Sequence, residues 1–122
     1  MTATAVQTKA APMPTRQWTE GQFQAWVVAN ARQAGFRVHV SMKRMRKASL
    51  VNDPDWPDLE MLRVDDRRHV FAELKAHGGR LSEGQREVIA ALEHIHDGTQ
   101  EVYVWSPDDA PAILDILFGP SA

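Results

Sequence analysis

The sequence predicts an α/β fold, with helices and strands in the order αβββαβα. Apolar residues recur at helical spacing in some segments, whereas shorter segments alternate or form continuous apolar runs. Turn residues separate these segments, notably Gly35, the triplet Asp65-Asp66-Arg67 and the pair Gly78-Gly79. With 122 residues and 43% hydrophobic content, the chain is long enough for one compact domain with one core.

The first helix is predicted to begin after Thr19. Gln22 stands three residues further on, which is the spacing of a capping box. Gly35 is expected to end this helix. Apolar residues recur between these two limits at helical spacing: Phe23, Val27, Ala31 and Ala34.

The remaining elements follow from alternation and from turn residues. Strands are predicted over residues 36–40, 59–64, 69–75 and 102–105. Ser82 is expected to cap a second helix, whose apolar face comprises Val88, Leu92 and Ile95. A closing helix is predicted over residues 110–118.

The first 17 residues differ in composition from the rest. Residues 1–17 are rich in Ala, Thr and Pro without periodicity, so we expect a disordered N-terminal tail and a folded domain over residues 18–119. The chain has no cysteine, which excludes a disulfide scaffold and a thiolate zinc site. Since it also has no long apolar run, we expect no membrane partner and a cytoplasmic location.

Charge is distributed unevenly along the chain. Residues 1–81 carry 13 Lys and Arg against 8 Asp and Glu, whereas residues 82–122 carry 1 Arg against 8 acids. A basic cluster precedes the Pro57-Asp58 pair and consists of Arg37, Lys43, Arg44, Arg46 and Lys47. This cluster is expected to bind phosphate groups, and a solvated basic loop is the alternative.

Two short motifs place carboxylates and an amine at the ends of predicted neighbouring strands. These motifs are Pro57-Asp58 and Glu73-Leu74-Lys75. Alternation puts Glu73 and Lys75 on one face of their strand, with Leu74 directed into the core. Carboxylate oxygens suit a hard divalent cation, and a lysine can orient a hydrolytic water. The alternative is a surface Glu/Lys pair, because E-x-K is common by chance.

The two motifs belong to an ordered set of short stretches that spans roughly residues 18–118. They are Thr19-Glu20-Gly21-Gln22-Phe23, Gly35-Phe36-Arg37-Val38, Pro57-Asp58-Leu59, Phe71-Ala72-Glu73-Leu74-Lys75, Gly79-Arg80-Leu81-Ser82-Glu83-Gly84-Gln85-Arg86 and Glu101-Val102-Tyr103-Val104-Trp105-Ser106-Pro107. Together these stretches resemble the PD-(D/E)XK nuclease superfamily and, within it, the virus-type replication-repair nuclease (VRR-NUC) group.

The resemblance implies a fold and a metal site. The expected fold is a restriction-endonuclease-like core, in which a mixed four-stranded sheet is flanked by helices. Asp58, Glu73 and the Leu74 carbonyl would bind Mg²⁺, for which Mn²⁺ can substitute, with Glu20 assisting. Lys75 would position the attacking water, and Gln85 would contact that water or DNA. The resemblance also implies that the cytoplasm in which the protein is expected is that of a bacterium or of a virus-infected host cell.

Several of these residues also have purely structural interpretations. Glu20 stands in the first turn of a helix, where a carboxylate complements the helix dipole. Gln85 occupies the capping-box position after Ser82, which explains it without a catalytic role. Asp55 competes with Asp58, although its place favours a turn. The neighbouring Trp56 either stacks on a base or is a half-buried core residue, and the half-buried core position is preferred.

The expected function is therefore a metal-dependent DNA endonuclease, structure-specific on branched DNA and similar to a Holliday junction resolvase. One chain offers one active site, so cutting both strands implies a homodimer. The four tryptophans of this short chain include candidates for a subunit interface. A flap or replication-fork nuclease, or a non-catalytic DNA-binding module, is the alternative.

Neutralising the basic cluster should weaken DNA binding without destroying the catalytic site. In a variant that replaces Lys43, Arg44, Arg46 and Lys47 with Gln, each lost phosphate contact should lower the log–log salt slope by about 0.9 on duplex DNA. Anisotropy titrations between low and moderate salt measure this slope. An unchanged slope would mean that DNA binds elsewhere.

Overall fold

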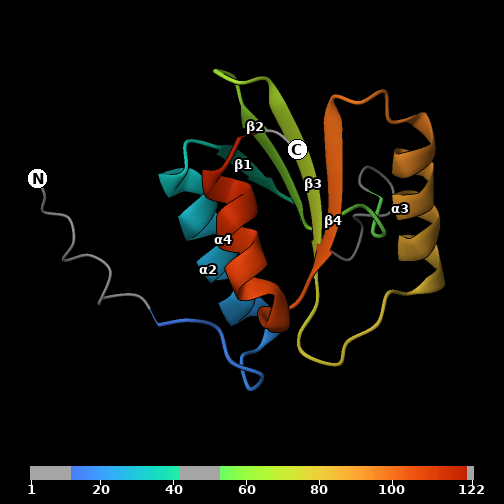
Figure 1. The fold of residues 1–122 in the computed structure, drawn as a ribbon. Helices are drawn as coiled ribbons and strands as arrows, with labels where there is room; N and C mark the ends of the chain where they lie inside the picture. Colours follow the sequence, from blue (N-terminus) through green and yellow to red (C-terminus); the bar gives the residue numbers. More distant parts are fainter. Residues whose placement is uncertain (1–11, 42–52, 121–122) are drawn as a thin grey trace, which may run out of the picture.

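The computed structural model describes residues 12–41 and 53–120 of the chain. Figure 1 shows a sheet with helices on both faces. The strand order is β1-β2-β3-β4, comprising β1 (Arg37–Val40), β2 (Leu59–Arg63), β3 (Arg68–Leu74) and β4 (Gln100–Trp105). The first two pairings are antiparallel and β3–β4 is parallel, so the predicted mixed four-stranded sheet is confirmed.

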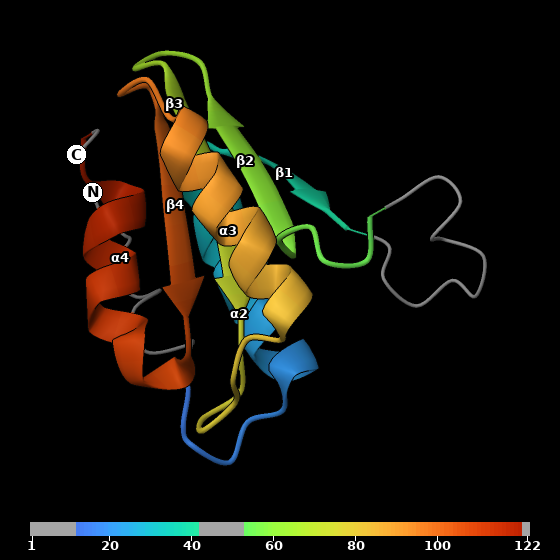
Figure 2. The same ribbon diagram turned by 90° about the vertical axis from the view of Figure 1, so that its right-hand side faces the viewer.

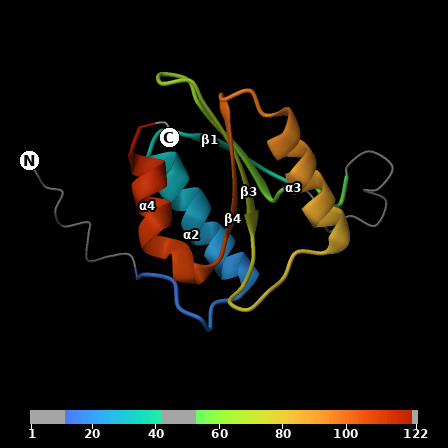
Figure 3. The same ribbon diagram turned by 45° about the vertical axis from the view of Figure 1, so that its right-hand side comes forward.

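The helices are divided between the two faces of the sheet. Figure 3 shows α2 (Glu20–Gln33) and α4 (Ala110–Phe118) on one face and α3 (Glu83–Ile95) on the other. A short 3₁₀ helix, η2 (Pro107–Asp109), leads into α4. All three α-helices begin at the end of the sheet where β3 and β4 finish (Figure 1). Among the described residues, no helix has the length and apolar character of a membrane span.

Local capping interactions explain where the first helix begins and ends. The Thr19 amide donates to Gln22 Oε1 at 2.8 Å, and the Gln22 amide donates to Thr19 Oγ1 at 3.1 Å. Gly35 adopts a φ of +97°, and the following Phe36 amide donates to the Ala31 carbonyl at 2.9 Å. A left-handed residue after the last turn is favourable for glycine, so the predicted limits of this helix are confirmed.

The main core lies between the sheet and the α2–α4 pair. Its buried members come from α2, β2, β3, β4, α4 and the residue before β1: Phe23, Trp26, Val27, Ala31, Phe36, Leu59, Met61, Val70, Ala72, Leu74, Trp105, Ala110, Ile113 and Leu117. The α3 side is less completely covered. Leu92 is buried there as predicted, but Ile95 is 72% exposed, because this last helical residue lies beyond the core cluster.

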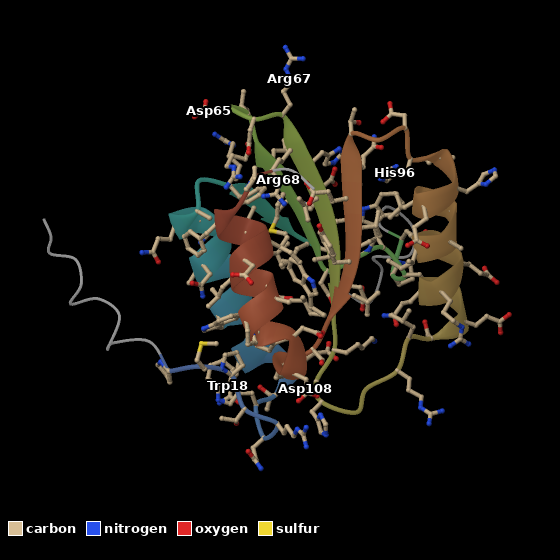
Figure 4. The ribbon with its side chains drawn as sticks, in the orientation of Figure 1. Trp18, Asp65, Arg67, Arg68, His96 and Asp108 are labelled. Atoms are coloured by element: carbon tan, nitrogen blue, oxygen red, sulfur yellow. The ribbon has the colours of Figure 1, made fainter. Side chains whose placement is uncertain are left out.

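Part of the predicted tail contacts the domain. The Trp18 amide donates to the Thr15 carbonyl at 3.1 Å, which closes a turn. Arg16 Nε lies 3.0 Å from Asp108 Oδ1 in η2, and Figure 4 shows Trp18 and Asp108 at the same end of the molecule. Arg16 and Trp18 therefore connect the segment before α2 to the rest of the domain.

A buried guanidinium joins β3, β4 and α4. Arg68 is 2% exposed and forms a bidentate pair with Glu101, with N–O distances of 2.6 and 2.8 Å. Its Nη1 also donates to the carbonyls of Ile116 and Gly119, at 2.7 and 2.9 Å. These contacts satisfy carbonyls at the C-terminal end of α4, which lack helical partners of their own.

Tyr103 completes this buried network. Its hydroxyl donates to Glu101 Oε1 at 2.7 Å. Burial opposes ionisation of Glu101, but the hydrogen bonds from Arg68 and Tyr103 outweigh it and lower the pKa of this carboxyl. Burial, assisted by the bond to Glu101, raises the pKa of Tyr103 to about 12. The carboxylate is therefore charged and the phenol neutral at neutral pH, and stability from Glu101 is lost as pH falls through its lowered pKa.

A second arginine, Arg63, binds the C-terminal carbonyls of both α2 and α4. Arg63 donates to the carbonyls of Ala34, Leu117 and Gly119, at 2.7 to 2.9 Å, and pairs with Asp66. The guanidinium groups of Arg63 and Arg68 both lie over the ring of Phe36, 4.7 and 5.3 Å from its centroid. The C-terminal ends of α2 and α4 are thus held together at one end of the sheet.

Replacing Arg68 with Met should destabilise the domain strongly, because it leaves the partly buried Glu101 carboxylate without its cation. Removing one partner of a buried pair costs about 3–5 kcal/mol. Urea unfolding monitored by tryptophan fluorescence measures this loss. Arg67→Met is the matched control, because Arg67 projects away from the hairpin tip (Figure 4) and should change stability by less than about 0.5 kcal/mol. Equal stability of the two variants would contradict the structural role of Arg68.

Candidate active site

The register of the β2–β3 hairpin brings the two predicted carboxylates together. Leu59 pairs with Ala72, so the preceding residue, Asp58, stands opposite Glu73. Asp58 Oδ2 accepts a hydrogen bond from the Leu74 amide at 2.8 Å, which orients this carboxylate toward the end of β3. Both residues are buried, Asp58 with 8% and Glu73 with 1% of its surface exposed.

Lys75 lies beside this pair. Its Nζ is 3.6 Å from Glu73 Oε2, and its side chain is only 15% exposed. The Lys75 amide donates to the Trp105 carbonyl at 2.9 Å, which extends the β3–β4 ladder by one residue. Two neighbouring strands therefore position Lys75 on the side of β3 that carries Glu73, as alternation predicted.

A hollow of about 210 Å³ opens next to Lys75. Its lining comes from the end of β3, the following loop and the end of β4: Lys75, Gly79, Leu81, Val104, Trp105, Ser106 and Asp109. Asp109 accepts from the Ser106 amide at 2.9 Å and so shapes one wall. Sequence reasoning did not identify Ser106 or Asp109, although the Ser-x-x-Asp spacing before α4 is a capping signal.

The segment before Asp58 is held by short polar contacts. The Ser41 amide donates to the Asp58 carbonyl at 2.9 Å, and Ser41 Oγ donates to the Pro57 carbonyl at 2.7 Å. Asp53 Oδ1 accepts from the Asp55 amide at 2.8 Å, which forms the expected turn. These contacts join the end of β1 to the start of β2 and fix the place of Asp58.

The first turn of α3 contacts the same segment. The Asp55 carboxylate lies directly against Gly84, where a Cβ atom would overlap it. A carboxylate at a helix N-terminus is favourable, because it complements the partial positive charge of the first amides. Asp55 therefore links the loop before Asp58 to α3, a role that the sequence assigned only to a turn.

Glu20 and Gln85 occupy helix starts. Glu20 is exposed in the first turn of α2. Gln85 Oε1 accepts from the Ser82 amide at 2.9 Å, and the Gln85 amide donates to Ser82 Oγ at 3.1 Å. The capping role of Gln85 is confirmed. Among the described residues, Glu20 does not form a metal-binding group with Asp58 and Glu73.

The Asp58–Glu73 pair suits a magnesium ion better than a metal that requires three or more protein ligands. Within residues 12–41 and 53–120, no group of three His, Cys, Asp or Glu side chains is placed to hold a metal. Magnesium usually binds through one or two carboxylates and keeps several waters or substrate phosphates. Asp58 and Glu73 supply two carboxylates of the kind that magnesium uses, whereas Glu20 forms no metal-binding group with them among the described residues.

Other charged residues lie around the same end of the sheet. His77 Nδ1 is 2.7 Å from Asp108 Oδ2, and Arg16 binds the other oxygen. The hydrogen bond with His77, then that with Arg16, lowers the pKa of Asp108. This cluster ties the loop after Lys75 to η2. The predicted DNA-binding residues Lys43, Arg44, Arg46 and Lys47 lie outside the described residues.

Comparison with known proteins finds no similar family or structure. No protein-family model, no curated protein and no solved structure matches this chain. The assignment of the site therefore rests on the geometry of its own residues.

Gly84→Ala should destabilise the protein, whereas the equivalent change at Gly21 should not. Both glycines are the second residue of a capped helix, in Thr19-Glu20-Gly21-Gln22 and Ser82-Glu83-Gly84-Gln85. At Gly21 a Cβ would meet only Thr19 Oγ1, at 3.9 Å, so alanine should stabilise α2 by up to about 1 kcal/mol. At Gly84 the clash with Asp55 should cost about 1–3 kcal/mol.

Urea unfolding of the four proteins tests this coupling: wild type, Gly84→Ala, Asp55→Ala and the double variant. The penalty of Gly84→Ala should disappear in the Asp55→Ala background, because the two residues interact directly. An additive double variant would show that Asp55 does not rest on α3.

Proposed function

We propose that this protein is a metal-dependent DNA endonuclease with a restriction-endonuclease-like core, of the PD-(D/E)XK superfamily and similar to its VRR-NUC group. The observation that carries the proposal is the meeting of Asp58, Glu73 and Lys75 at one end of the mixed sheet. These residue types match those that hydrolyse phosphodiesters with a hard divalent cation.

Burial of the two carboxylates favours a functional site over a surface ion pair. An exposed Glu/Lys pair contributes little, but Glu73 is 1% exposed and stands opposite another carboxylate. Placing two like charges opposite each other in a buried position is unfavourable. A divalent cation bound between the two carboxylates would offset that repulsion.

Each residue of the site has a distinct role in this proposal. Asp58, Glu73 and the Leu74 carbonyl would hold Mg²⁺ or Mn²⁺, which lowers the pKa of a bound water and stabilises phosphoryl charge. The ammonium of Lys75 would orient the attacking water, whose oxygen bonds to phosphorus as the ester P–O bond breaks. The Leu74 amide holds Asp58 in place during this reaction.

The substrate is proposed to be branched DNA. A symmetric four-way junction has two equivalent cut sites, so a resolvase would act as a homodimer with two active sites related by a two-fold axis. A single-copy enzyme would instead suit a flap or a replication fork. A non-catalytic DNA-binding module is the alternative from another class, but it gives no reason for the buried Asp58–Glu73 pair.

Asp58→Asn and Glu73→Gln should each abolish cleavage and weaken Mg²⁺ binding, because each removes a charged oxygen ligand. Lys75→Met should lower the rate by at least about 100-fold and leave Mg²⁺ affinity nearly unchanged. Cleavage of labelled linear, flap, fork and four-way DNAs in Mg²⁺ or EDTA measures activity, and calorimetric titration measures metal binding.

Glu83→Gln is the matched control, since Glu83 is an exposed carboxylate in the first turn of α3. It should cleave and bind Mg²⁺ like the wild type. Thermal unfolding should show that all variants remain folded, because the Asn and Gln substitutions keep side-chain shape. Wild-type cleavage by Asp58→Asn or Glu73→Gln would rule out the proposed metal site.

A further inference from the structure

Trp56 differs from the other tryptophans in its exposure. Trp26 and Trp105 are 8% and 4% exposed and belong to the core, and Trp18 packs partly against it. Trp56 is 37% exposed, which agrees with the half-buried position preferred from the sequence. A large aromatic surface remains in contact with solvent although three similar side chains are buried or partly buried.

The exposed ring is nevertheless held in place. It contacts the ring of Phe71 edge-to-face, with centroids 6.0 Å apart and planes at 82°. Phe71 is 5% exposed and also contacts the ring of His69, at 4.7 Å. The Trp56 amide donates to the Asp53 carbonyl at 3.1 Å, and the next residue, Pro57, is buried. Because these contacts already restrict the Trp56 side chain, it should lose little conformational entropy when a ligand binds to it.

The ring also lies on the face of the sheet that carries the candidate active site. Phe71 and Glu73 alternate with core residues of β3, so both point to the α3 side. Trp56 contacts Phe71 and precedes Asp58 by two residues. An aromatic surface is therefore fixed beside the two carboxylates.

A groove lies over β1 and β2. It has a volume of about 290 Å³ and is lined by Arg37, Val38, His39, Glu60 and Leu62. Glu60 pairs in register with Phe71, which places the groove next to the Trp56–Phe71 contact. Figure 2 shows that α3 lies over β3 and β4, and no other described helix lies over β1 and β2 on this side of the sheet.

The charges in this groove permit a polyanion. Arg37 and His39 are exposed, and alternation places both on the uncovered face of β1. Glu60 is the opposing charge, but its Oε2 lies 2.8 Å from His69 Nε2, which donates to it or, when protonated, pairs with it. An arginine near an aromatic ring is a combination that binds single-stranded nucleic acid.

We infer that Trp56 stacks on an unpaired DNA base next to the phosphodiester to be cut, and that the strand continues over Arg37 and His39. This inference rests on the proposed nuclease function and narrows its substrate class to DNA with unpaired nucleotides at the cut site. A fully paired duplex cannot use this ring, because neighbouring base pairs cover the faces of its bases.

Binding to two probes in EDTA tests the inference without cleavage. One probe is a duplex with a single-stranded tail that carries 2-aminopurine, whose fluorescence falls on stacking, and the other is a blunt duplex. Trp56→Ala should bind the tailed probe about 5- to 150-fold more weakly than the wild type and bind the blunt duplex equally well. Wild type and Trp56→Phe should quench 2-aminopurine, and Trp56→Ala should not.

Val64→Ala is the control, because Val64 is 77% exposed at the hairpin end of the sheet and should bind both probes like the wild type. Equal affinity of Trp56→Ala and wild type for the tailed probe, or an equal loss on both probes, would overturn the inference. If the wild-type protein quenches 2-aminopurine but cuts no DNA in Mg²⁺, the stacking site is supported and the nuclease function is refuted. Failure of the stacking inference can therefore be distinguished from failure of the proposed function.

Discussion

The buried guanidinium of Arg68 determines how the helices are arranged on the sheet. It joins Glu101 of β4 to the last carbonyls of α4, and Arg63 extends the same connection to the end of α2. Since the C-terminal ends of both helices are held here, their N-termini lie at the opposite end of the sheet (Figure 1). Asp58 and Glu73 occupy that opposite end, so the arginine network orients the elements around the candidate site without touching it.

Both ends of β3 carry buried charged side chains. At one end Arg68 makes a bidentate pair and two carbonyl contacts, all between 2.6 and 2.9 Å. At the other end Glu73 is equally buried, with Lys75 Nζ 3.6 Å from its carboxylate and Asp58 opposite it. The Arg68 contacts connect three elements of the fold, whereas the contacts at the Glu73 end stay within the β2–β3 hairpin and the residue after β3.

Sequence patterns predicted the elements whose signals are local. The capping box at Thr19, the turn at Gly35 and the hairpin at Asp65-Asp66-Arg67 each depend on neighbouring residues, and all three are confirmed. The Arg68–Glu101 pair was not predictable, because it joins residues 33 positions apart through a parallel strand pairing. The exposure of Ile95 also escaped prediction, because periodicity identifies an apolar face but not where the covering surface ends.

The candidate site, like the fold, was predictable where its signals are local in the sequence. Period-two alternation places Glu73 and Lys75 together, and the hairpin places Asp58 opposite them, so these three residues followed from local geometry. Glu20 and Gln85 carry a weaker signal. The motifs that contain them recur almost identically at the starts of α2 and α3, each forming a capping box. Because capping alone explains a motif that occurs twice, the catalytic proposal depends on Asp58, Glu73 and Lys75, and not on the helix starts around them.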